Sequence, residues 1–263
     1  MRAGEVDGCL RGLDIRFEKG KLHGVIGRVG SGKSSLLLAL LGEPTLSKGA
    51  LAIDGSIPIA YVPQQPWIIN ASVRENVLMG AVYEKSRYDA VMSACALDSD
   101  LARMQNGDAT ELGERGVTVS GGQKLRVALA RACYSSATLV LLDDPLASVD
   151  AHVGKHIYQS CILDFLLKQT GRTVIMTTHA IHTVNGMDNV ILIDEGKLVA
   201  QGPPATVARV DHPLAQEINQ ELMSPPDIVE EEATLDGGVH AMLGKPSPDL
   251  SIAGMFYRSA HNH

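Results

Sequence analysis

The feature that most constrains this chain is a glycine-rich segment, residues 27–34, which runs Gly-Arg-Val-Gly-Ser-Gly-Lys-Ser. The apolar run Leu22–Ile26 precedes it and predicts a short buried strand, and the apolar run Ser34–Leu41 follows it and predicts a helix. Glycines allow successive backbone N–H groups to face one point, where the positive end of the helix dipole adds to them. The segment therefore predicts a phosphate-binding loop between a strand and a helix.

Strand-like and helix-like patterns alternate along the rest of the chain. Strands are expected at Ala50–Ile53, Ile57–Val62, Leu139–Leu142, Thr173–Thr178 and Val190–Ile193, the last forming a hairpin with Lys197–Ala200. Helices are expected at Gln123–Tyr134 and His152–Leu167. This order predicts an α/β fold, with a P-loop NTPase core, a mostly parallel sheet, an antiparallel β subdomain and an inserted helical subdomain.

The domain organisation follows from length and local composition. The 263 residues fit one large domain with a tail, and we expect residues 1–222 to form the domain. From about residue 71 to 135 the pattern is mainly helical and polar, which predicts the inserted helical subdomain. After residue 222 the composition changes, and the chain contains a Ser-Pro-Pro segment, the run Glu230–Glu232 and scattered Gly and Pro. This composition predicts that residues 223–263 form a disordered acidic linker or tail.

Charge and hydropathy exclude some classes of function. The formal net charge of −7 argues against broad nucleic-acid binding, which needs a basic surface. No apolar run approaches the roughly 20 residues of a membrane-spanning helix. Arg2, Glu5 and Asp7 interrupt the start, so it does not resemble a signal peptide. We therefore expect the chain itself to be soluble.

The cysteines lie far apart in the sequence. They are Cys9, Cys95, Cys133 and Cys161. No two have the spacing of a zinc or redox pair, so the sequence predicts reduced thiols in a cytosolic compartment.

Two charged residues complete the expected phosphate site. Lys33 is expected to reach the β- and γ-phosphates, and the Ser34 hydroxyl to take a magnesium position. Asp143 ends the apolar strand 139–142, and a carboxylate at the carboxyl end of a central parallel strand points to the ligand crevice, where it would orient the magnesium shell. The residues expected to bind the nucleotide are Gly27, Arg28, Val29, Gly30, Ser31, Gly32, Lys33, Ser34 and Ser35.

Residues 119–123, Val-Ser-Gly-Gly-Gln, indicate which class of phosphate-loop protein this is. They resemble the signature of the ATP-binding-cassette (ABC) family, usually Leu-Ser-Gly-Gly-Gln, from which Val119 departs mildly. A serine hydroxyl and glycine N–H groups at a helix N-terminus form a second anion site. The resemblance implies that Ser120, Gly121, Gly122 and Gln123 cap the γ-phosphate of a nucleotide held by a partner domain.

Other segments resemble further elements of this family, in the family's order. They are Tyr61–Trp67 for the Q-loop, Glu111–Gly116 for a short exporter motif, Ala147–Asp150 for the D-loop and Thr177–His179 for the H-loop. The resemblance covers roughly residues 8 to 215. It implies that Gln64 is a magnesium and coupling residue, that His179 contacts the γ-phosphate, and that ATP and Mg²⁺ are the cofactors.

Three details resemble the first cassette of subfamily C, which includes multidrug-resistance-associated proteins. The segment between Lys33 and Gln64 is short, residues 62–76 resemble that cassette closely, and Asp144 stands where most members carry a catalytic Glu. In the family, the residue that follows the strand-end Asp normally polarises the attacking water. Asp is shorter than Glu by about 1.5 Å, and a misplacement of about 1 Å can cost about 10²-fold in rate. We therefore expect slow hydrolysis.

The beginning of the chain departs from the family. Cassettes usually carry an adenine-stacking aromatic in their first strand, and residues 1–16 contain no aromatic. Phe17, in the strand-like segment Leu13–Phe17, is interpreted as a core residue. The N-terminal strand is thus expected to be missing, with Met1 inside the domain.

The resemblance implies a transporter ATPase module at the cytoplasmic face of a membrane. Its partners would be a second cassette, paired head to tail, and transmembrane domains. Alternatives are a nucleotide-sensing regulatory cassette with negligible turnover, a soluble non-transport ABC ATPase, and a truncated, inactive product.

Overall fold

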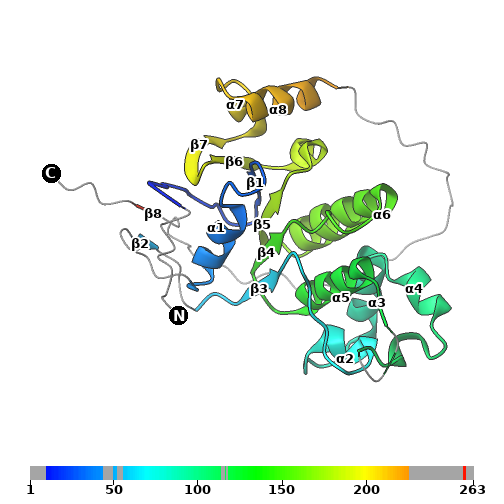
Figure 1. Cartoon of the computed structure of the whole chain (residues 1–263). Coiled ribbons are helices and arrows are strands. Elements are labelled where there is room, and N and C mark those ends of the chain that lie inside the picture. The colour runs from blue at the N-terminus through cyan, green and yellow to red at the C-terminus, as the bar shows by residue number, and fades with distance from the viewer. Residues whose placement is uncertain are drawn as a thin grey trace, which may run out of the picture.

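The fold is a six-stranded sheet with helices on both faces (Figure 1). The computed structural model describes residues 10–43, 50–51, 56–113, 116, 118–224 and 257–258. The strands are β1 (Leu22–Ile26), β3 (Ile59–Val62), β4 (Leu139–Asp143), β5 (Thr173–Thr178), β6 (Asn189–Asp194) and β7 (Lys197–Gly202). Their order is β3-β4-β5-β1-β6-β7, and every neighbouring pair is parallel except the antiparallel hairpin β6–β7. This arrangement confirms the predicted α/β P-loop fold.

Alternating side chains of the strands build one core on each face of the sheet. Leu22 and Ile26 of β1 join the core that includes α5 (Gly121–Tyr134), whereas Val25 joins the core that includes α1 (Lys33–Leu40). β4 is divided in the same way, with Val140 in the first core and Leu141 in the second. Every residue of β1 and β4 is buried, including the polar residues His23 and Asp143, and the other residues of both strands are apolar, as is typical of central parallel strands.

The helices cover the two faces unequally. In Figure 1, α1 lies on one side of the sheet, α5 and α6 lie on the other, and α7 and α8 lie beyond the hairpin β6–β7. The remaining helical elements are α2 (Val73–Leu78), α3 (Lys85–Ala94), α4 (Asp98–Arg103), η1 (Gly107–Ala109), α6 (Ala151–His156), η2 (Ile157–Gln169), η3 (Ile181–Gly186), α7 (Pro204–Val207) and α8 (Pro213–Met223). A separate two-stranded pair joins β2 (Ala50–Leu51) to β8 (Tyr257–Arg258) in antiparallel fashion.

Local contacts fix the start of the helical segment α2–α5. The Ser72 hydroxyl accepts a hydrogen bond from the Glu75 N–H, and the Glu75 carboxylate accepts one from the Ser72 N–H, which together cap α2. Arg131 of α5 ties this segment to the chain after β3, because its guanidinium stacks 4.0 Å from the centre of the Trp67 ring and donates to the Asn76 carbonyl oxygen at 2.8 Å.

Several boundaries differ from the sequence-based expectations. The helix expected at 152–167 is a short α-helix, α6, that continues as a π-helix, η2. The strand-like segment Leu13–Phe17 forms no strand in the described part of the chain, although Phe17 is buried as expected. Most of the expected tail, residues 225–256 and 259–263, and the first nine residues lie outside the described part of the chain.

In the described part of the chain, no helix has the length and apolarity needed to cross a membrane.

Burial predicts different costs for two matched valine truncations. Val140 is fully buried in β4, whereas the Val82 side chain is 88% exposed. We expect Val140→Ala to lower the free energy of unfolding by about 2–3 kcal/mol, since it removes buried methyl groups and leaves a cavity. Val82→Ala should change it by less than about 0.5 kcal/mol. Urea titrations of both variants measure the difference, and equal costs would contradict this assignment of the core.

Candidate nucleotide-binding site

The glycine-rich loop leaves β1 and enters α1 with little space for side chains. A Cβ atom on Gly27 would lie 2.3 Å from the Ile193 carbonyl oxygen, so only glycine fits there without displacing backbone. Gly32 precedes α1 with a φ of +102°, a left-handed conformation that favours glycine. No side chain caps α1, so the first N–H groups of this helix remain directed at the loop. This geometry suits an anion.

Lys33 lies folded against the loop. Its ammonium group donates to the carbonyl oxygens of Gly27 at 2.8 Å and Arg28 at 2.9 Å. Burial lowers the pKa of Lys33, and the nearby carboxylates of Asp144 and Asp143 partly offset that effect. The loop thus carries a positive charge held in place by its own backbone.

Asp143 connects three elements of the site. One carboxylate oxygen accepts hydrogen bonds from the Ser34 hydroxyl at 2.9 Å and from the Thr177 hydroxyl at 2.7 Å. The other lies 3.5 Å from the Tyr61 hydroxyl, and burial together with this carboxylate raises the pKa of Tyr61 to about 12. The structure therefore places the expected magnesium residues Ser34 and Asp143 in direct contact.

Asp144 occupies an unusual backbone position beside His179. Its φ is +48°, and its N–H donates to both the carbonyl oxygen and the hydroxyl of Thr177. One carboxylate oxygen lies 3.0 Å from His179 Nδ1, and the other is buried without a hydrogen-bond partner. Burial raises the pKa of Asp144, while His179 and Lys33 act in the opposite direction. The Asp144 side chain thus lies in the site although burial removes part of its hydration.

The segment 119–123 forms the beginning of α5. The Ser120 hydroxyl accepts from the Gln123 N–H at 3.2 Å, and the Gln123 side chain accepts from the Ser120 N–H at 2.9 Å, which forms a capping box. Gln123 also donates to Asp100 at 2.9 Å, and Asp100 pairs with Arg126 at 2.7 Å. The Gln123 side chain therefore anchors the helix start, a contact that the sequence did not predict.

Gly122 lies against the chain that follows Asp144. A Cβ atom on Gly122 would lie 3.0 Å from the Ser148 carbonyl oxygen, within the segment 147–150 expected as the D-loop. Next to that segment, residues including Asp144, Asp150 and His179 line a cavity of about 300 Å³. The signature-like segment and the D-loop-like segment therefore share one steric contact.

The structure brings some of the expected site residues together, whereas other described residues of the expected site form no hydrogen bond with them. Lys33, Ser34, Asp143, Asp144 and His179 lie together at the carboxyl ends of β1, β4 and β5. In the described part of the chain, no hydrogen bond joins this group to Gln64, which is exposed, or to residues 120–123. Glu114 and Arg115 of the exporter-like segment lie outside the described residues.

Two contacts were missed by reasoning from the sequence. Thr177 and Tyr61 both meet Asp143, but each was interpreted only as part of a motif. For Thr177 the parallel register explains the contact, because Asp143 of β4 pairs with Thr177 of β5. The strand order therefore indicates which polar residue of the neighbouring strand lies level with Asp143.

The oxygen groups of the site fit a hard divalent ion. The Ser34 hydroxyl and the Asp143 carboxylate are the ligand types that Mg²⁺ prefers. The Ser31 hydroxyl is buried in the loop without a hydrogen-bond partner, which leaves a polar atom of the loop unsatisfied. The loop and its carboxylates therefore suit a phosphate–magnesium pair.

Comparison with known proteins identifies the family. The ABC transporter family model matches residues 10–147, more than half of the chain. The chain belongs to the ABC transporter family. It is 48% identical over 193 residues to the ABC-type transporter cicA of Emericella nidulans, and 46% identical over 193 residues to ATP-binding cassette sub-family C member 4 of Mus musculus. Both alignments cover 73% of this chain and 14% of the relative.

A third relative extends this picture. Multidrug resistance protein mrp-7 of Caenorhabditis elegans is 45% identical over 194 residues, which cover 73% of this chain and 12% of that protein. The chain thus spans about one seventh of the length of these relatives. It is similar to the ATP-binding domain of sub-family C transporters, which confirms the resemblance drawn from the motifs.

The raised pKa of Asp144 predicts that replacing its carboxylate with a neutral amide changes stability in a pH-dependent way. The folded chain keeps the Asp144 carboxyl proton at pH values where the unfolded chain has lost it. Asp144 therefore lowers the free energy of unfolding as pH rises from the ordinary pKa of 3.8 through the raised pKa. Asp144→Asn removes this loss and keeps an oxygen acceptor for His179. We expect the variant to gain stability relative to the native chain between pH 4 and pH 7, measured by urea unfolding.

Asp150→Asn is the matched control. A hydrogen bond from the Val153 N–H lowers the pKa of Asp150, so its carboxylate adds stability as pH rises through the lowered pKa to the ordinary value of 3.8. Between pH 4 and pH 7 this variant should therefore be less stable than the native chain by a nearly constant amount. A change of the same sign in both variants would contradict the assigned environments.

Proposed function

We propose that this chain binds MgATP as the nucleotide-binding domain of a multidrug-resistance-protein type ABC exporter, and that it resembles the first cassette of such a protein. The observation that carries the proposal is the contact of Asp143 with the Ser34 and Thr177 hydroxyls beside the Lys33 loop. In that arrangement a phosphate-binding loop and an oxygen-rich metal position lie side by side. The similarity to sub-family C relatives supports the transporter assignment.

The loop would hold the nucleotide phosphates. Backbone N–H groups of residues 27–35 and the Lys33 ammonium neutralise the phosphate charge. Ser34 and Asp143 would hold Mg²⁺, with Gln64 completing the position from the chain after β3. The ion, when bound, supplies charge stabilisation at the phosphate oxygens. Lys33 then has to exchange its bonds to the Gly27 and Arg28 carbonyl oxygens for the phosphates.

Asp144 and His179 would act on the hydrolytic water. The Asp144 carboxylate accepts a proton or orients water, and His179, 3.0 Å away, holds that carboxylate and contacts the γ-phosphate. Because Asp is shorter than the usual Glu by about 1.5 Å, we propose that this site turns over slowly. A regulatory cassette that binds ATP with negligible turnover is the second candidate, and the short Asp144 side chain at the position of the usual Glu supports it.

The signature-like segment would serve a second nucleotide. Ser120 and the glycines after it lie at the start of α5, separate from the Lys33 loop, so one domain cannot close both around one nucleotide. Head-to-tail pairing with a second cassette resolves this, with each nucleotide held between the loop of one domain and the signature of the other. We propose that the domain works in this way at the cytoplasmic face of a membrane, coupled to transmembrane domains.

Removal of the loop ammonium tests the binding site. We expect Lys33→Ala to weaken MgATP binding by about 10- to 100-fold, because a charge-assisted bond to phosphate is lost. Lys168→Ala is the matched control, since that lysine is exposed and pairs with Asp164 on the protein surface. Calorimetry of both variants with MgATP makes the comparison. Unchanged binding by Lys33→Ala would rule out this loop as the nucleotide site.

The division of labour between two sites predicts unequal effects of two substitutions. In an assembled transporter that contains this domain, Gly122→Asp should abolish most ATPase activity. Its carboxylate would bring a negative charge to an anion site and would press on the Ser148 carbonyl oxygen. Asp144→Asn should cost much less, because it affects only the slow site. ATPase rates of the two variants test this, and equal losses would establish Asp144 as a competent base.

A further inference from the structure

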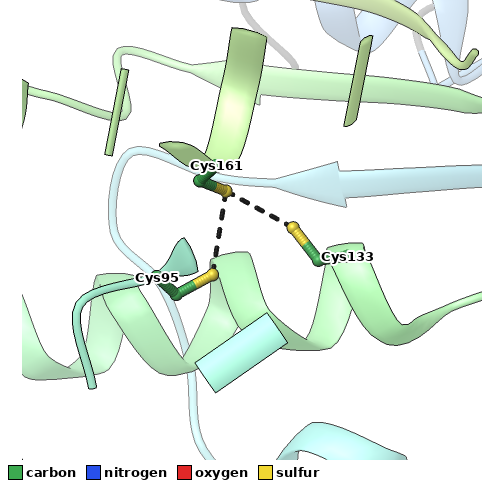
Figure 2. Close-up of side chains that lie close together, drawn as sticks. All are labelled: Cys95, Cys133 and Cys161. Carbon is green, nitrogen blue, oxygen red and sulfur yellow. Dashed lines mark hydrogen bonds between the residues drawn. The ribbon is translucent and has the colours of Figure 1, made fainter. Parts of the chain in front are cut away.

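Three cysteines that are distant in the sequence meet inside the protein (Figure 2). Cys161 of η2 lies between the other two, with its sulfur 3.4 Å from that of Cys133 on α5 and 3.7 Å from that of Cys95 at the end of α3. All three sulfurs lie within 4.8 Å of one another. The spacing of these three residues along the chain gave no indication that they meet.

The thiols are reduced and enclosed. The separations are well beyond the roughly 2.0 Å of a disulfide bond, and each cysteine is fully buried. They come from three helical elements, so the packing of α3, α5 and η2 brings them together. Cysteines pack well as small apolar residues, but that role does not require three sulfurs to face one point.

The triangle has the dimensions of a metal–thiolate centre. An ion about 2.3 Å from three sulfurs separates them by about 4.0 Å when it lies in their plane, and by less when it lies above it. The distances of 3.4 Å and 3.7 Å lie a few tenths of an ångström below this value, and the third distance is at most 4.8 Å. Shifts of a few tenths of an ångström would therefore admit an ion.

A buried cation accompanies the cluster. Arg172 is only 7% exposed, and its guanidinium donates to the carbonyl oxygens of Ala132, Cys133 and Ser135 at the end of α5. Its charge acts on both Cys133 and Cys161. In the described part of the chain it forms no ion pair with a carboxylate. An anionic centre beside it would balance this charge.

We propose that Cys95, Cys133 and Cys161 form a binding site for a soft monovalent ion, Cu(I). Thiolate sulfur selects soft ions, and no fourth His, Cys, Asp or Glu joins the group among the described residues, whereas structural zinc sites almost always have four ligands. Binding replaces three thiol protons, which pass to solvent, because only thiolates bind the ion. The centre then carries two negative charges, one of which the Arg172 guanidinium neutralises. No electron is transferred.

Burial determines how the ion must enter. Because no sulfur is exposed, loading accompanies folding or an opening of the helices, as for other buried metal sites. The test therefore refolds the full chain without oxygen in the presence of Cu(I) held by the chelator bicinchoninate. Loss of the chelator's colour measures transfer of the ion, and X-ray absorption measures its ligands. MgATP binding is followed separately, so this site and the proposed nucleotide site can fail independently.

The expected result is transfer of one Cu(I) per chain to three sulfurs at about 2.2–2.3 Å. Cys161→Ser should weaken binding by at least about 100-fold, because it removes the central ligand, whereas the matched Cys9→Ser should leave it unchanged. Failure of the native chain to take Cu(I), equal binding by Cys161→Ser, or dependence on Cys9 would overturn the proposal. Exclusive binding of Zn²⁺ would also overturn it. If Cys161→Ser does not fold, the sulfur count in the native chain decides.

Discussion

The carboxylate of Asp143 is the group on which the rest of the site depends. It accepts hydrogen bonds from the Ser34 hydroxyl at the start of α1 and from the Thr177 hydroxyl on β5, while its own backbone ends β4. One side chain, 5% exposed, thereby holds three elements at hydrogen-bonding distance. Because burying a carboxylate is costly, each hydroxyl that it gains offsets part of that cost and restricts the site to one arrangement.

The sheet makes this arrangement rigid. β1 and β4 are buried along their whole length, with alternate side chains packed into the two cores, so their carboxyl ends cannot move without disturbing packing on both faces. Asp143 is the last residue of β4, and the turn 27–32 lies immediately beyond β1. The site thus combines a short turn with a residue at a strand end, and the buried apolar side chains of the strands hold both in place.

The sequence predicts those parts of the molecule that depend on local order. The segment 27–34, the strand ending at Asp143 and the helix after Ser120 are each set by neighbouring residues, and the structure has all three. Contacts between distant segments are different. Neither the Thr177 hydroxyl on Asp143 nor the meeting of Cys95 with Cys161 has a local pattern, because strand register and helix packing create them. The same holds for η2, since a π-helix differs from an α-helix in hydrogen bonding rather than in apolar periodicity.

The approach of Gly122 to Ser148 has a mechanical consequence. A Cβ atom at this position would lie 3.0 Å from the Ser148 carbonyl oxygen and 3.7 Å from the Val149 side chain, so the start of α5 approaches the segment that follows Asp144 closely because residue 122 has no side chain. Close-packed interiors pass on displacements instead of absorbing them. A movement of residues 147–150 toward α5 would therefore displace the start of that helix, and a side chain at position 122 would force the two segments apart.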